Sequence, residues 1–92
     1  MHEVTLNIDD ELTDAADDLL IKIYQQLPGW QGIDAYDNCP HWTLTQCEVI
    51  AAIEPTGLHL SSFPEQDISS WIEHFCQVAS RELKFTVQEH AN

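Results

Sequence analysis

The residues of this sequence whose types could do chemistry gather in two short stretches. The first holds a carboxylate, a thiol and an imidazole at alternate positions, namely Asp37, Cys39 and His41. These are the residue types of a thiol nucleophile with its general base, and cysteine and histidine are also ligands that zinc accepts. The second stretch repeats a histidine–cysteine pair at His74 and Cys76.

The spacing of these groups disfavours both kinds of chemistry. His74 and Cys76 lie two positions apart in a segment with helical periodicity, so their side chains point about 200° apart and cannot bind one ion. Cys39 and His41 have no identifiable third group or oxyanion-binding loop, and the sequence has no glycine-rich phosphate loop. We therefore expect no enzymatic activity, no cofactor and no metal, with Cys39 and His41 as the remaining candidates for metal ligands.

Charge is the strongest global signal of the sequence. Sixteen Asp and Glu residues against three Lys and Arg residues give a formal net charge of −13. Such a surface repels nucleic acid and anionic lipid, because both bind proteins through Lys and Arg. It favours a basic protein partner, which long-range attraction would bring to the surface rapidly. We therefore expect a basic protein partner and no direct binding of nucleic acid or membrane. A solvated acidic surface without a partner is the alternative.

Many of the acidic residues fall in the segment 10–27, where apolar residues recur at helical spacing. The stripe predicted to face the core consists of Leu12, Ala15, Ala16, Leu19, Ile23 and Leu27. Asp14, Asp17 and Asp18 lie opposite this stripe on a helix, with Ile21 at the centre of the acidic face. We interpret these four residues as a partner-binding surface. The alternative is that the acids only favour the dipole of the first helical turn.

The segment 28–42 is the second candidate binding region. Its Pro, Gly, Asn and Asp residues break any regular period, which predicts a long loop with a short strand near 33–36. Trp and Tyr are typical anchors of protein interfaces, so we add Trp30 and Tyr36 to the predicted partner surface. The alternative is that these rings and Trp42 fold back over the open end of a small core.

The elements that position these residues follow from hydrophobic periodicity. The predicted elements are strands at 2–8, 42–54, 58–63 and 84–88 and helices at 10–27 and 66–82. Whether 42–54 forms one bulged strand or two stays open. The order β-α-β-β-α-β is the ferredoxin-like, split βαβ arrangement. We therefore predict an α+β two-layer sandwich with both helices on one face of a mostly antiparallel sheet, and an extra strand within 31–46 as the expected departure.

The length of 92 residues predicts a single domain over 1–92. The residues expected in its core are Leu6, Leu19, Ile23, Val49, Ile53, Leu60, Trp71, Phe75 and Val87. Three irregularly spaced cysteines without a preceding secretory signal predict reduced thiols and a cytoplasmic location. Both a monomer and a homodimer are compatible with the sequence.

The leading hypothesis is a small, acidic, non-enzymatic protein-interaction module. An immunity protein, an inhibitor or a nucleic-acid mimic that occludes a basic partner surface would be its concrete form. The alternative is a small-ligand or metal-binding protein that uses the aromatic segment 28–42.

Overall fold

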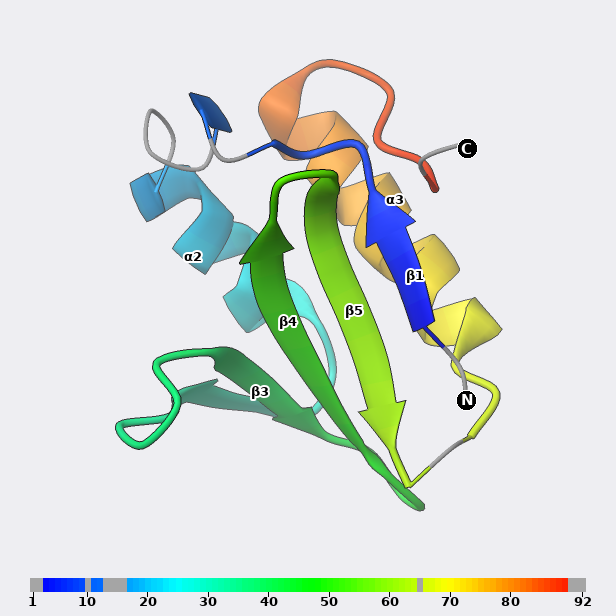
Figure 1. Cartoon of the computed structure of the whole chain (residues 1–92). Helices are drawn as coiled ribbons and strands as arrows, with labels where there is room; N and C mark the ends of the chain where they lie inside the picture. Colours follow the sequence, from blue (N-terminus) through cyan, green and yellow to red (C-terminus); the bar gives the residue numbers. More distant parts are fainter. Residues whose placement is uncertain (1–2, 10, 13–16, 65, 90–92) are drawn as a thin grey trace.

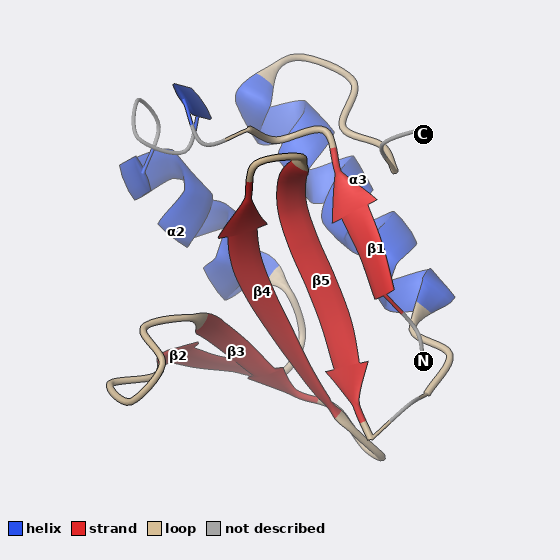
Figure 2. Cartoon of the chain, viewed as in Figure 1, coloured by secondary structure: helices blue, strands red, loops and turns tan. Residues whose placement is uncertain are grey.

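One antiparallel sheet and two helices make up the described part of the chain in a computed structural model (Figure 1). The structure describes residues 3–9, 11–12, 17–64 and 66–89. Its strands are β1 (Glu3–Leu6), β2 (Trp30–Ile33), β3 (Pro40–Thr43), β4 (Glu48–Glu54) and β5 (Gly57–Phe63), and its helices are α2 (Asp17–Gln26) and α3 (Ser69–Leu83). The strands lie in the order β1-β5-β4-β3-β2, and every neighbouring pair is antiparallel. Both helices lie on one face of the sheet (Figure 2).

This arrangement belongs to the expected α+β class but shows that the predicted ferredoxin-like fold is wrong. The elements follow in the order β-α-β-β-β-β-α. The segment 28–42 forms the β2–β3 hairpin instead of a long loop. The predicted last strand at 84–88 is absent, because this end of the described chain meets the sheet only at the isolated Leu6–Glu89 bridge and at the bond from the Asn7 N–H to the Gln88 carbonyl.

The segment 42–54 holds the end of one strand and the whole of the next. The chain reverses between Leu44 and Cys47, where the Leu44 N–H donates to the Cys47 carbonyl at 2.8 Å. A second tight turn at 55–56 joins β4 to β5, with Glu54 paired to Gly57. The strands β2 to β5 therefore form a continuous meander, and β1 is added beside β5.

The core lies between the sheet and the two helices. Of the residues predicted to be buried, those confirmed are Leu6, Ile23, Val49, Leu60, Trp71, Phe75 and Val87. The predicted stripe of α2 was right at Ile23 and Leu27 but wrong in phase at Leu19, which is only partly buried, whereas Leu20 and Tyr24 face the core. Five of the six residues from 19 to 24 are apolar or aromatic, which supports more than one stripe on a helix, so periodicity alone could not select the inner one.

An aromatic cluster joins the helices to the β2–β3 hairpin. Trp42 is 0% exposed, and its ring centroid lies 5.0 Å from that of Trp71 and 5.4 Å from that of Tyr24. Its indole N–H donates to the Tyr24 backbone carbonyl at 3.0 Å. Trp30 packs beside it, with the two ring centroids 5.3 Å apart. Both tryptophans of the hairpin therefore cover the core.

Within the described residues, no helix combines the length and the apolar character that a membrane crossing requires. All three cysteines are free thiols, with Cys47 buried and both Cys39 and Cys76 partly exposed.

Candidate functional site

The tip of the β2–β3 hairpin contains the cluster of Asp34, Asp37 and His41. One potential ligand atom from each side chain lies within 4.8 Å of the others. Asp34 Oδ1 accepts from the backbone N–H of Tyr36 at 2.7 Å, and Asp37 Oδ1 accepts from that of Cys39 at 2.9 Å. These are the hydrogen bonds of Asp residues that form turns.

The Cys39 thiol lies beside this cluster, but His41 does not contact the thiol. His41 Nε2 lies 2.9 Å from Asp37 Oδ2, whereas the Cys39 thiol donates to the Asp37 backbone carbonyl at 3.4 Å. Burial, and then the carboxylates of Asp37 and Asp34, raise the pKa of the Cys39 thiol. A thiol held in its protonated form is a poor nucleophile and a poor metal ligand. The hydrogen bonds of Asp34 and Asp37 shape the turn at the hairpin tip, while Asp34, Asp37 and His41 keep the residue types of a metal-binding group.

Replacing Asp37 with asparagine is expected to lower stability at neutral pH and to leave it unchanged in strong acid. The backbone N–H of Cys39 and the His41 side chain hold the pKa of Asp37 below its ordinary value of 3.8. The carboxylate therefore stabilises the folded state above that value, and the contribution is lost as the pH falls through the lowered pKa. Thermal melts of both proteins across this pH range measure the difference.

Asp18→Asn is the control, because it removes the same charge from an exposed position on α2. An equal pH dependence in this control would contradict a specific role for the Asp37 carboxylate.

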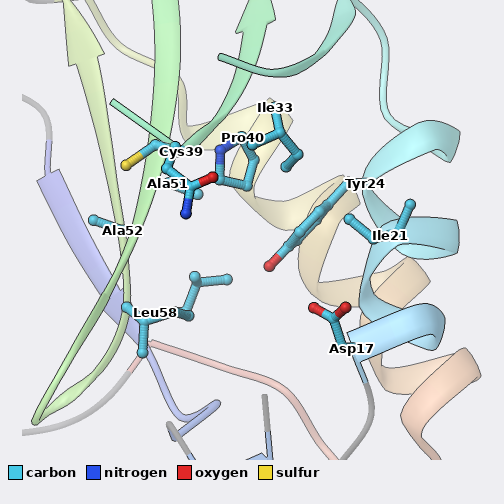
Figure 3. A pocket seen from close by; sticks show the side chains of 11 residues that line it. Asp17, Ile21, Tyr24, Ile33, Cys39, Pro40, Ala51, Ala52 and Leu58 are labelled. Carbon is cyan, nitrogen blue, oxygen red and sulfur yellow. The ribbon is translucent and has the colours of Figure 1, made fainter. Parts of the chain in front are cut away.

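A cleft of about 280 Å³ opens between α2 and the sheet, on the side of the hairpin (Figure 3). Apolar side chains from α2, the hairpin, β4 and β5 form its walls: Ile21, Tyr24, Ile33, Pro40, Ala51, Ile53 and Leu58. Two of them are large and exposed, Ile33 at 43% and Ile53 at 42%. The Asp17 carboxylate, in the first turn of α2, adds a negative charge to this apolar surface.

Tyr24 is the polar group at the inner wall of the cleft. The residue is only 4% exposed, and its hydroxyl points into the cleft, as the Asp17 carboxylate also does (Figure 3). Burial, and then the charge of Asp17, raise the pKa of Tyr24 to about 12. The phenol therefore stays protonated, and no hydrogen bond joins its hydroxyl to the described residues. The cleft thus offers one hydroxyl donor beside an anionic group.

No protein-family model matches the chain, and no curated protein or solved structure matches it either. Function is therefore inferred from the geometry and charge of the chain itself.

The structure gives the predicted residues of α2 different surroundings. Asp17 and Asp18 are exposed, but only Asp17 lines the cleft. Ile21 is partly buried against the core and lines the cleft instead of standing at the centre of an acidic face. Asp14 lies outside the described residues.

The two aromatic residues predicted to bind a partner lie in different surroundings. Trp30 packs in the aromatic cluster, whereas Tyr36 is 100% exposed at the hairpin tip. Sequence reasoning missed Tyr24, Ile33 and Leu58 as parts of a site, and it placed Ile53 in the core. The signal that could have found Ile33 is an isoleucine in a segment otherwise rich in turn-forming residues.

Proposed function

We propose that the protein is a small, acidic, non-enzymatic interaction module that binds and occludes a basic surface of a protein partner. The observation that carries the proposal is the apolar cleft with Asp17 at its edge in a chain of net charge −13. Exposed apolar side chains that gather around a concave surface are typical of interaction sites. Ile33 and Ile53 occupy that position here.

The charge around the cleft selects the kind of partner. Asp17 and Asp18 begin α2, and the exposed Glu54 follows Ile53 at the end of β4. Arg81, one of the three basic residues, already bonds to Glu82 and Gln26. A lysine or arginine of a partner can place its apolar stem along the cleft wall and its charge near Asp17. Apolar contact then provides affinity, and the acidic surface accelerates association.

This mode of action corresponds to an immunity protein, an inhibitor or a nucleic-acid mimic that acts in the cytoplasm. It requires a stable surface and no reacting group. The three thiols and the hairpin cluster would then have structural roles only.

The test begins with the capture of binding proteins from native cells on the immobilised domain at low and high salt. A captured basic protein is purified, and its association and dissociation rates are measured with the parent and with variants. Asp17→Lys is expected to slow association, because it reverses a charge that attracts the partner. Ile53→Ser is expected to speed dissociation about tenfold, since an apolar anchor acts after docking.

Ile50→Ser is the matched control, because it makes the same change on the same strand but not on the cleft wall. We expect its rates to stay within about twofold of the parent, as for a residue outside an interface core. Equal rates for the parent, Asp17→Lys and Ile53→Ser would overturn the proposal.

A further inference from the structure

The sheet is split between β3 and β4. These strands pair at three positions only, His41 with Ile50, Trp42 with Val49 and Thr43 with Glu48. On its other side β4 pairs with β5 along its whole length, as far as Glu54. Residues 51–54 of β4 therefore have a strand neighbour on one side only within the described chain. Figure 2 shows the two strands diverging from the end at which they pair.

Pro40 explains why the pairing stops. Continuing the register of β3 and β4 by one position places Pro40 opposite Ala51. Proline has no N–H, so it cannot donate a hydrogen bond to a neighbouring strand. The residues that precede Pro40 form the hairpin tip, where Asn38 adopts a left-handed conformation with φ 59°.

The split leaves backbone hydrogen-bonding groups without a strand partner. Alternate residues of an antiparallel strand direct their N–H and C=O groups to opposite neighbours. In β4 the residues directed toward the missing neighbour are Ala51 and Ile53, and of the two Ala51 is buried whereas Ile53 is 42% exposed, so the edge is accessible at Ile53. The other edge of the sheet, at β1, is partly covered. Leu6 forms a bridge with Glu89, and the Asn7 N–H donates to the Gln88 carbonyl at 3.1 Å.

We propose that the gap is a site for strand addition, in which an extended basic segment of the partner protein pairs with the exposed end of β4, at 53–54. This inference rests on the proposed function and specifies the conformation and side-chain pattern of the partner. Extended peptides bind exposed sheet edges in this way, with main-chain hydrogen bonds for affinity and pockets for alternate side chains.

The surroundings of the gap match such a segment in their side chains. The cleft lies beside Ile53, so a side chain of an added strand can enter it and meet Ile21 and Ile33. The unpartnered hydroxyl of the buried Tyr24 offers a hydrogen bond there.

The remaining side chains of an added strand would point to the other face of the sheet. Glu54 belongs to that face by strand alternation, so a basic residue fits beside it. A sequence that alternates apolar and basic residues therefore satisfies both faces. A second copy of this chain is the less favourable occupant, because each copy carries a net charge of −13.

The probe for this proposal is a capped peptide of alternating lysine and valine. Two isomers of the same charge are N-methylated, one at every valine amide and the other at every lysine amide. All residues of one type direct their N–H groups to the same edge of an extended peptide. We therefore expect one isomer to lose at least about tenfold in affinity, the cost of about one main-chain hydrogen bond or more, while the other binds nearly as the unmodified peptide does.

Amide hydrogen exchange locates the bound peptide. The unmodified peptide is expected to slow exchange at residues 53–54 and to leave β1 unchanged. Ile53→Ser should weaken its binding, whereas the matched variant Ile50→Ser should not. Thermal melts of both variants establish that they are folded.

Several outcomes would overturn strand addition. They are equal binding by both N-methylated isomers, absence of binding by all three peptides, protection of β1 instead of β4, and protection of 53–54 by a second copy of the chain as its concentration rises. The proposed function fails separately. Suppose that a basic protein binds the parent but not Asp17→Lys, and that N-methylation of the peptide does not change its affinity. The proposed interaction module would then be supported, and strand addition would be refuted.

Discussion

Replacing Trp42 with alanine is expected to destabilise the domain by about 3–5 kcal/mol. The side chain is fully buried where β3 meets both helices, and its ring contacts those of Trp71 and Phe75. The substitution also removes the hydrogen bond from the indole to the Tyr24 carbonyl. A domain of this length has a total stability of about 5–14 kcal/mol, so this single change removes a large part of it.

Urea denaturation of the parent and the variant measures this loss. Trp42→Phe retains a ring but not the indole N–H. We therefore expect its stability to lie between that of the parent and that of Trp42→Ala. Tyr36→Ala is the control, because its side chain is fully exposed, and surface substitutions usually change stability by less than about 0.5 kcal/mol. A loss below about 1 kcal/mol for Trp42→Ala would mean that the aromatic cluster does not anchor the hairpin.

Gly57→Ala is expected to cost about 3 kcal/mol or more, through a mechanism that involves no cavity. Gly57 begins β5 with φ 138°, a conformation that side chains rarely adopt. A Cβ at this position would lie 2.1 Å from the backbone oxygen of Leu6. Since backbone cannot move aside as a flexible side chain can, β1 must separate from β5 at this point.

Gly32→Ala is a comparison that separates the cost of backbone strain from the cost of the clash with Leu6. Gly32 also has a positive φ, of 98°, but a Cβ there has open space around it. We expect a loss of about 1–2 kcal/mol from backbone strain alone. Thermal and chemical unfolding of both variants give the comparison, and equal losses would show that the contact with Leu6 is unimportant.

The elements with long, regular patterns were predictable from the sequence. The hairpin at β4 and β5 is marked by the Pro55-Thr56-Gly57 turn, and α3 follows from the spacing of Trp71, Phe75 and Val78. The extra strand expected within 31–46 is present as β3, but its pairing with β2 was missed because each strand has four residues and Gly32 interrupts the alternation of β2. The segment 84–88 alternates as a strand would, but local alternation does not reveal whether a sheet edge is available to it.

The candidate site was less predictable than the fold. The walls of the cleft come from four elements, so Ile21, Ile33 and Ile53 meet only when the strand order is known. The sequence indicated an apolar residue near acids at Ile21, and this pairing with Asp17 is present in the cleft. Tyr24 carried no signal, because a tyrosine on a helix is equally compatible with a core or a surface position.

The unpaired stretch of β4 has a consequence for the free protein. An exposed strand edge can pair with the same edge of another molecule, which is a route to aggregation. The high negative charge opposes this by keeping identical molecules apart. Near the isoelectric point that repulsion vanishes while the edge remains. The acidic composition would then do more than attract a partner, because it would also keep the binding-competent monomer from assembling with itself before the partner arrives.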